Sequence, residues 1–259
     1  AENFLQMLMG VVDSYLVASL GLVAISGVSV AGNIISIYQA IFIALGAAVS
    51  SLISKSLGEG DRDNLAYHTN EAIKLTLILS VFLGLFSLVF GRQILAWLGT
   101  EPVVANAGGL YLALIGGTIL LLGLMTTLGS LIRATSNPRM PMYISFLSNL
   151  LNVIFSSLAI FIFHMGIVGV ALGTILARLV GVLILWKELS LPLVPWSWRL
   201  DWDLLRLSLP AAGERLMMRA GDVVIIAIIV KFGTAAVAGN AIGEVLTQFN
   251  YMPGFAVAT

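Results

Sequence analysis

The sequence has little charge and no cysteine. Only 10% of its 259 residues are Asp, Glu, Lys or Arg, whereas about a quarter are charged in a soluble domain. The absence of cysteine excludes disulfides, thiolate metal sites and thiol nucleophiles. The two histidines, His68 and His164, are far apart in the sequence, which leaves little basis for a histidine metal site or a catalytic triad.

The net charge and the missing motifs argue against several further classes of function. The 13 basic and 13 acidic residues cancel, so nothing points to nucleic acid as a partner. No P-loop motif is present, so ATP is not expected to drive the protein directly. No nucleophile stands with a base, and no metal cluster is evident, so we expect neither an enzyme nor a bound cofactor.

Long apolar runs dominate the sequence. The chain is 59% hydrophobic with a mean hydropathy of +1.03, and the runs recur along its whole length, unlike a single cleaved signal peptide. A membrane-spanning helix needs about 20 mostly apolar residues. The pattern predicts an all-α membrane protein with about eight transmembrane helices, near 1–20, 28–57, 66–90, 105–133, 141–163, 166–189, 204–231 and 238–259.

Basic residues in the predicted loops set the expected orientation. One set of alternate loops holds seven of them: Lys55, Arg62, Arg133, Arg139, Lys187, Arg199 and Arg206. The other set holds only Arg92 and Lys231. Because cytoplasmic loops carry an excess of Lys and Arg, we expect the first set and the amino terminus to be cytoplasmic in a multi-pass cell-membrane protein.

The segment LPLVPWSWRLDW, with two prolines and three tryptophans, predicts a division of the chain. We expect a six-helix amino-terminal lobe at 1–190, a cytoplasmic linker at 191–203, and the first two helices of a second lobe at 204–259. A shift of 212 positions lays Glu2 on Glu214 and Gly21 on Gly233, which is consistent with a parallel repeat. The sequence therefore looks like a fragment of a twelve-helix transporter fold.

Asp13 is the least expected residue, because it lies within the apolar stretch VVDSYLVASLG. Counting from the neighbouring turns places Asp13, Asn152 and Thr174 at a similar depth, roughly 12–17 Å from the same side. A charged aspartate at such a depth costs about 2.5–3.5 kcal/mol, so it should face a bundle interior or a cavity and have partners. Burial disfavours the charged carboxylate and hydrogen-bond donors favour it, so its protonation is switchable.

Three stretches together resemble the multidrug and toxic compound extrusion (MATE) transporters. GAAVSSLISKSLGEGDRDN at 46–64 is similar to that family's second helix and following turn. LIRATSNPRMPMYISFLSNLLNVIFS at 131–156 resembles its fourth loop and fifth helix, and GIVGVALGTILARLVG at 166–181 resembles its sixth helix. They occur in family order and at family spacing, and the resemblance covers nearly the whole chain.

The resemblance implies a coupling-cation site. Asp13 matches the family's carboxylate for the coupling proton or sodium, Asn152 the asparagine beside it, and Thr174 the threonine of the sixth helix. Ser156 stands where many members have a second aspartate, which weakens a sodium site. Arg178 stands where the family more often has an uncharged residue. If it reaches Asp13 it would replace a metal cation, so we expect H⁺ rather than Na⁺, and no firm metal site.

Other polar residues are weaker candidates. Glu214 and Asp222 share one face of the seventh span, and with Glu244 of the eighth they are second-lobe candidates for the same chemistry or for an acid–base ladder. On the second span, Asn33, Tyr38 and Gln39 are substrate-contacting candidates, although packing explains each of them as well. His68, Glu71 and Lys74 predict an interfacial charge cluster at the start of the third span.

These observations favour a secondary active exporter that exchanges protons, or less readily Na⁺, for amphipathic or cationic organic compounds. A lipid-linked precursor flippase is the alternative, although its cavity should be strongly basic. A third possibility is that the fragment alone is inert. We expect small organic substrates and the lipid bilayer as partners, no nucleic acid, and a monomer when the protein is full length.

Overall fold

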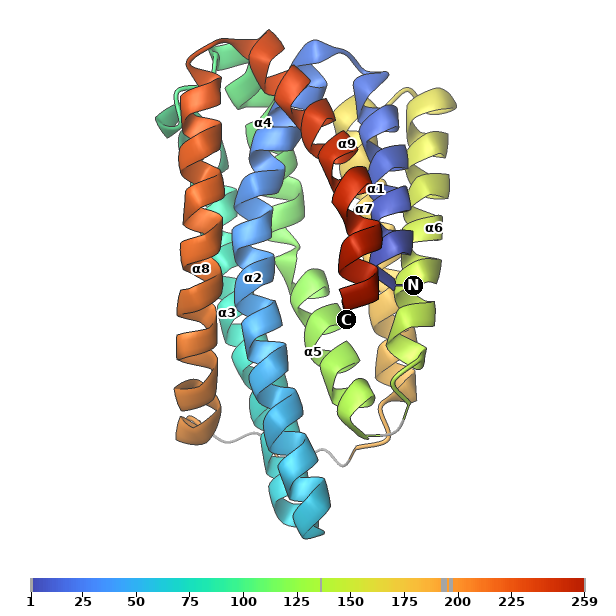
Figure 1. Ribbon diagram of the computed structural model, residues 1–259, viewed down its shortest axis with the longest axis vertical. Helices are drawn as coiled ribbons and strands as arrows, with labels where there is room; N and C mark the ends of the chain where they lie inside the picture. Colours follow the sequence, from blue (N-terminus) through green and yellow to red (C-terminus); the bar gives the residue numbers. More distant parts are fainter. Residues whose placement is uncertain (1, 136, 192–194, 196–197, 259) are drawn as a thin grey trace.

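The computed structural model describes residues 2–135, 137–191, 195 and 198–258, and at 2–7, 9, 252 and 255–258 it describes the backbone alone. Within these residues the chain is helical and has no strand (Figure 1). The helices are α1 Glu2–Ala18, α2 Leu22–Glu59, α3 Arg62–Trp97, α4 Pro102–Gly117, α5 Ile119–Thr135, α6 Met140–Phe161, α7 Gly166–Glu188, α8 Trp202–Val230 and α9 Thr234–Ala258. The predicted all-α class is confirmed.

The helices run up and down between two ends of the molecule (Figure 1). The turns after α1, α3, α6 and α8 lie at the upper end of that view. At the lower end α2 turns into α3, α5 ends, α6 begins, α7 ends and α8 begins. The loops predicted to be rich in Lys and Arg therefore share one end of the fold.

The predicted span at 105–133 is two helices. α4 and α5 meet at Thr118 with a bend of 46°. The Thr118 hydroxyl donates to the carbonyl of Leu114 at 2.8 Å. Gly116 and Gly117, which directly precede Thr118, have low helix propensity. Hydropathy alone missed this break because the residues around it remain apolar.

Fewer helices than the eight predicted are both long enough and apolar enough to span a membrane. In the described part of the chain, α2, α3, α6 and α7 are long and apolar enough, and α4 with α5 makes a fifth if the bent pair is one span. α1 has 17 residues, and α8 carries four charged side chains between 214 and 222. These two helices and α9 were predicted spans that do not reach this threshold.

Local chemistry explains the sharp turn between α2 and α3. α2 ends at Gly60, whose φ of 69° suits glycine because it has no Cβ. Asp61 then begins α3 by accepting hydrogen bonds from the backbone N–H groups of Asp63 and Asn64. The sequence GEGDRDN therefore makes the turn between the second and third predicted spans.

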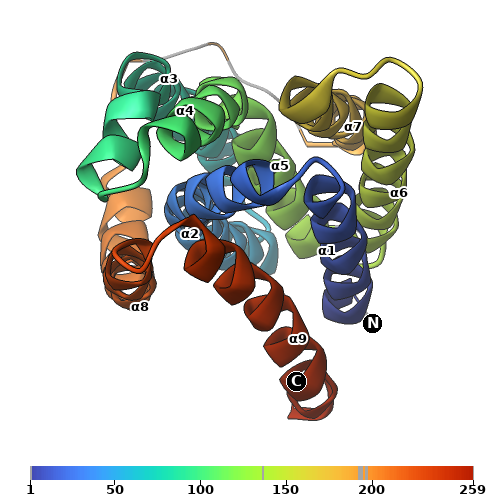
Figure 2. The same cartoon turned by 90° about the horizontal axis from the view of Figure 1, so that it is seen from above.

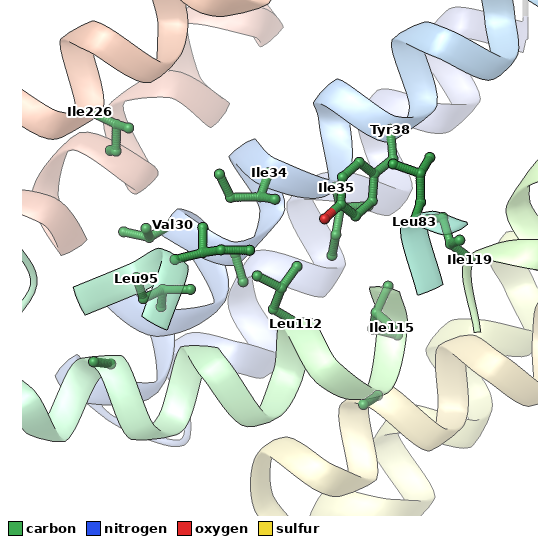
Figure 3. Packing of buried hydrophobic residues seen from close by; sticks show 14 of the residues in the cluster. Val30, Ile34, Ile35, Tyr38, Leu83, Leu95, Leu112, Ile115, Ile119 and Ile226 are labelled. Carbon is green, nitrogen blue, oxygen red and sulfur yellow. The ribbon is translucent and has the colours of Figure 1, made fainter. Parts of the chain in front are cut away.

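α2 is the central helix of the bundle. Seen from above, α1, α6 and α7 group on one side of it and α3, α4 and α8 on the other, with α5 alongside (Figure 2). Val30, Ile34 and Ile35 of α2 pack with Leu112 of α4 and Ile226 of α8 in one buried cluster (Figure 3). A second buried cluster, which includes Leu16, Ile160 and Val170, fixes α1 against α6 and α7. This packing places Asp13 beside Asn152.

Candidate functional site

Four polar side chains from three helices meet in one hydrogen-bonded group. Asn152 of α6 donates through Nδ2 to Oδ2 of Asp13 on α1 at 3.0 Å. The Oδ1 atom of Asn152 accepts from Ser156 and from Thr174 of α7, each at 3.1 Å. We call these residues the Asp13 cluster. The structure brings together all four residues of the predicted coupling site.

Asn152 joins the three helices because an amide has both a donor and an acceptor. Its NH₂ group faces the carboxylate of Asp13, and its oxygen faces two hydroxyl donors. The Thr174 hydroxyl is also 3.0 Å from the carbonyl of Val170, so its one proton is shared between two acceptors. The Asn152 side chain therefore connects Asp13 to both α6 and α7, so a change in the charge of Asp13 alters the hydrogen bonds of both helices.

Two glycines let α6 and α7 approach closely enough for this contact. A Cβ atom at Gly173 would lie 2.6 Å from Oγ and 2.8 Å from the backbone nitrogen of Ser156. A Cβ at Gly169 would lie 2.7 Å from the Cβ of Ala159. Small residues allow such close helix packing in membranes. The Gly-x-x-x-Gly spacing of Gly169 and Gly173, just before Thr174, thus sets the distance at which Thr174 reaches Asn152.

Asp13 is only half satisfied. Its Oδ2 atom accepts the bond from Asn152, whereas its Oδ1 atom is buried and has no hydrogen-bond partner. Leaving a buried polar atom unpaired costs about 1–3 kcal/mol, and more for a charged group. An ionised carboxylate in this place is therefore open to binding a proton or a cation.

Arg178 lies one turn of α7 below Thr174. It interacts electrostatically with Asp13, yet although both side chains are described they form no direct ion pair, and its Nη1 atom is buried without a hydrogen-bond partner. Tyr111 of α4 lies within electrostatic range of both groups. Sequence reasoning missed Tyr111, because an aromatic residue in an apolar helix is ordinarily a packing residue.

A cavity of about 550 Å³ lies directly below the Asp13 cluster, between α2, α5, α6 and α7. Arg178 and Asn149 line it, each one turn below a member of the cluster. Of the three substrate-contacting candidates, Gln39 also lines it.

The other two candidates lie elsewhere. Tyr38 is buried in the core beside Leu83 and Ile119 (Figure 3), where its hydroxyl is 2.8 Å from the Ser87 hydroxyl of α3. Asn33 donates to the carbonyl of Ser29 on its own helix. Neither lines this cavity, and a substrate contact at either residue stays a prediction.

The second-lobe candidates do not join the Asp13 cluster. Asp222 forms an exposed ion pair with Arg219 at 3.1 Å, and Glu244 accepts from Asn240 at 3.1 Å, in both cases on the same helix. Glu214 is exposed on α8. These three residues therefore remain predictions without a shared site among the described residues.

The charge cluster predicted at the start of the third span is buried within the protein. Lys74 bonds to Glu71 and to the backbone carbonyl of Arg199, and Nδ1 of His68 is 2.7 Å from Oδ2 of Asp201. The chain before α8 covers these side chains, which the sequence could not indicate because the partners are separated by more than a hundred residues. We call His68, Glu71, Lys74 and Asp201 the lower cluster.

Comparison with protein families matches residues 1–158 to the MatE family. The chain belongs to the MatE family. The resemblance read from the three sequence stretches is therefore confirmed. Its membership, with several apolar helices, makes it a multi-pass membrane protein of a transporter family, and the expectation that it is not an enzyme is confirmed.

Curated MatE relatives cover almost all of the chain. It is 26% identical over 269 residues to a probable multidrug resistance protein NorM of Thermotoga maritima, covering 99% of this chain and 58% of the relative. It is 24% identical over 265 residues to the probable multidrug resistance protein YpnP of Bacillus subtilis, covering 99% of this chain and 60% of the relative. The chain thus spans under two thirds of the length of these relatives.

Solved MatE structures share the fold. The inward-facing conformation of a multidrug resistance MATE family transporter of the MOP superfamily superposes with a TM-score of 0.88 at 19% identity, over 98% of this chain and 59% of that one. The MATE multidrug transporter DinF-BH, solved in complex with a dye, also gives 0.88, at 22% identity, over 97% of this chain and 59% of that one. The transporter fold predicted from sequence is confirmed.

Proposed function

We propose that the whole protein is a secondary active exporter that exchanges protons, bound at Asp13, for small organic compounds. The observation that carries this proposal is the half-satisfied carboxylate: Oδ1 of Asp13 is buried without a partner, while Oδ2 is tied through Asn152 to α6 and α7. Membership in the MatE family supports the class of transport.

A proton suits this site because it removes the charge that burial penalises. Asn152 and the electrostatic interaction with Arg178 favour the ionised form, whereas burial among apolar helices favours the neutral form. These opposing influences make protonation sensitive to small rearrangements. Tyr111 is the remaining titratable group in electrostatic range of Asp13 among the described residues.

Sodium fits the Asp13 cluster less well. A cation site needs several free oxygens, but Oδ1 of Asn152 already accepts from two hydroxyls and Ser156 offers no charge. Asp13 is the one carboxylate among the four residues of the cluster, and Arg178 supplies a positive charge nearby. We therefore assign H⁺ as the coupling ion.

Exchange requires the proton and the exported compound to oppose each other. Protonation of Asp13 would weaken its link to Asn152 and change how α1 packs on α6 and α7. By linkage, the compound must disfavour the proton by the same factor by which the proton disfavours the compound. As the exported compounds we propose amphipathic or cationic organic molecules; the relatives named as probable multidrug resistance proteins support export of small organic compounds in general.

The same relatives favour this exporter over the lipid-linked precursor flippase considered as the alternative. We place the lower end of the molecule in the cytoplasm, because the loops rich in Lys and Arg lie there. Because α1 runs toward the upper end (Figure 1), its amino-terminal side would then face the cytoplasm, and we propose that the whole protein works as a monomer in the cell membrane.

Dye uptake into inverted vesicles, or dye efflux from cells, tests the proposal. An imposed proton gradient should drive export of a cationic rhodamine dye by the wild-type whole protein, and Asp13→Asn should abolish the dependence on the gradient. Asn152→Ala should weaken it, because α1 loses its link to α7. Gradient-driven efflux that persists in Asp13→Asn would refute the proposal, and a requirement for Na⁺ would overturn the assignment of the proton.

A further inference from the structure

The cavity below the Asp13 cluster is positively charged. Arg178 and Arg133 line it, and no Asp or Glu is among its described lining residues. Arg133 is exposed at the lower end of α5, whereas Arg178 reaches in from the middle of α7. A site built for a cationic compound alone would present carboxylates to the cavity.

Arg178 has bonding capacity that the protein leaves unused. Its Nη1 atom is buried and unpartnered, and Asp13 is near enough to interact with it but forms no ion pair with it. A guanidinium group offers five N–H donors in a planar fork that suits carboxylate and phosphate groups. Leaving such donors unpaired is costly in a site of low dielectric.

Neutral polar side chains line the same cavity as the guanidinium. Gln39, Ser145 and Asn149 line the cavity, and their side chains form no hydrogen bond within the described part of the chain. Apolar lining comes from Ile43, Leu122 and Met125. The wall therefore combines the partly buried guanidinium of Arg178, hydrogen-bonding groups without partners and an apolar surface.

We propose that this cavity binds the anionic group, a carboxylate or a phosphate, of an amphipathic ligand, with Arg178 as its main contact. The apolar wall receives the rest of the ligand, and Asn149 and Ser145 supply further hydrogen bonds. The anionic group belongs either to a soluble organic anion or to the headgroup of an anionic lipid.

This ligand is distinct from the exchanged compound. Arg178 stabilises ionised Asp13 electrostatically, so an anion that occupies Arg178 removes that stabilisation, and the anion and the proton favour each other's binding. Exchange demands the opposite sign for the exported compound. The anion site thus goes beyond the proposed function, and it does not depend on Asp13 being the coupling carboxylate.

Binding of two related dyes tests the site. Fluorescein is an anionic xanthene and rhodamine 123 a cationic one, and fluorescence anisotropy measures both on the whole protein in phosphatidylcholine nanodiscs. Arg178→Gln should weaken fluorescein binding by about tenfold or more, because a charge-assisted hydrogen bond is lost. Arg178→Lys should recover part of it. At an alkaline pH, where Asp13 is ionised with or without Arg178, neither variant should weaken binding of the rhodamine.

The matched control is Arg139→Gln, which removes an exposed positive charge from the lower end at a residue that does not line the cavity. Fluorescein binding that is unchanged in Arg178→Gln, or that falls equally in Arg139→Gln, would overturn the proposal. Thermal unfolding of each variant shows that it is folded. Should Arg178→Gln not fold, the comparison of Arg178→Lys with Arg139→Gln decides in the same way.

Asp13→Asn separates this proposal from the proton exchange. It should tighten fluorescein binding, because Arg178 no longer serves an ionised Asp13, and looser binding would contradict the shared role of Arg178. If Arg178→Gln leaves fluorescein binding unchanged, the anion site is refuted but the proton exchange is not. If gradient-driven efflux persists in Asp13→Asn, the proton exchange is refuted but the anion site is not.

Nanodiscs of equal phosphatidylcholine and phosphatidylglycerol identify the source of the anion. If the anion is a lipid headgroup, phosphatidylglycerol should weaken fluorescein binding to the wild type but not to Arg178→Gln. If the anion is a soluble compound, the ratio of the two proteins' fluorescein affinities should be the same with and without phosphatidylglycerol. Either result is consistent with an anion site at Arg178, and the two differ only in the source of the anion.

Discussion

The lower cluster and the Asp13 cluster differ in how completely their aspartates are hydrogen-bonded. In the lower cluster, both carboxylate oxygens of Asp201 are used: Oδ2 faces His68, and Oδ1 accepts from the backbone N–H groups of Asp203 and Leu204 at the start of α8. In the Asp13 cluster, one carboxylate oxygen has a donor and the other has none. A fully paired acid stabilises one arrangement, whereas a half-paired acid can gain a proton.

Their positions fit this difference. The lower cluster fastens α3 to the beginning of α8, where Asp201 is 5% exposed. The Asp13 cluster joins α1 to α6 and α7 beside a cavity. The first therefore serves the assembly of the helices, and we assign the second to the working cycle.

The largest expected effect on stability is at the lower cluster. Asp201→Ala removes the cap of α8 and leaves His68 buried without its partner, so we expect a loss of about 2–4 kcal/mol. Asp61→Ala is the matched control, because Asp61 caps α3 in the same way but is partly exposed and pairs with no histidine. It should cost about 1 kcal/mol in thermal unfolding. Equal losses would mean that the His68 contact contributes nothing.

The next effect concerns the approach of α6 and α7. Gly173→Ala places a methyl group against Oγ and the backbone of Ser156, so we expect a loss of about 1–3 kcal/mol and weaker proton-driven efflux. Gly213→Ala is the control, because a Cβ there meets nothing within 4 Å. It should be neutral or stabilising by up to about 1 kcal/mol. If Gly173→Ala behaves like this control, the close packing does not hold the Asp13 cluster together.

The smallest effect on stability is expected at Asp13 itself. Asp13→Asn keeps the shape and removes a charge whose Oδ1 atom has no partner, so the thermal unfolding temperature should stay the same or rise. Unlike Asp201→Ala, it should act on coupling and not on folding. A loss as large as that of Asp201→Ala would make Asp13 a structural residue and would remove the contrast between the two clusters.

Position along a helix was the most predictable part of the site. Depth counted from the turns placed Asp13, Asn152 and Thr174 at one level, and the resemblance to MATE transporters named the same residues. The depth depends on helical rise, which follows directly from residue counts, whereas the resemblance rests on the sequence stretches themselves. The bonds among them also required the small residues Gly169 and Gly173, whose packing role only the structure makes specific.

Distances between helices were not predictable. Arg178 was expected to form an internal ion pair with Asp13 if it reached it, but how far a side chain extends across a bundle depends on packing that sequence does not encode locally. The partner of His68 was missed for the same reason, since Asp201 is 133 residues away. One signal was available: the Asp-x-Asp spacing at 201–203 repeats the capping pattern at 61–63.

The most direct test of the account is proton release when an exported compound binds. A cationic rhodamine dye is added to the purified whole protein in a weakly buffered detergent solution at a pH where it supports efflux, and the pH change is recorded. The wild type should release up to about one proton per bound dye, because the two compete at Asp13, and Asp13→Asn should release none. Binding without proton release, or equal release by Asp13→Asn, would contradict the claim that Asp13 is the coupling carboxylate.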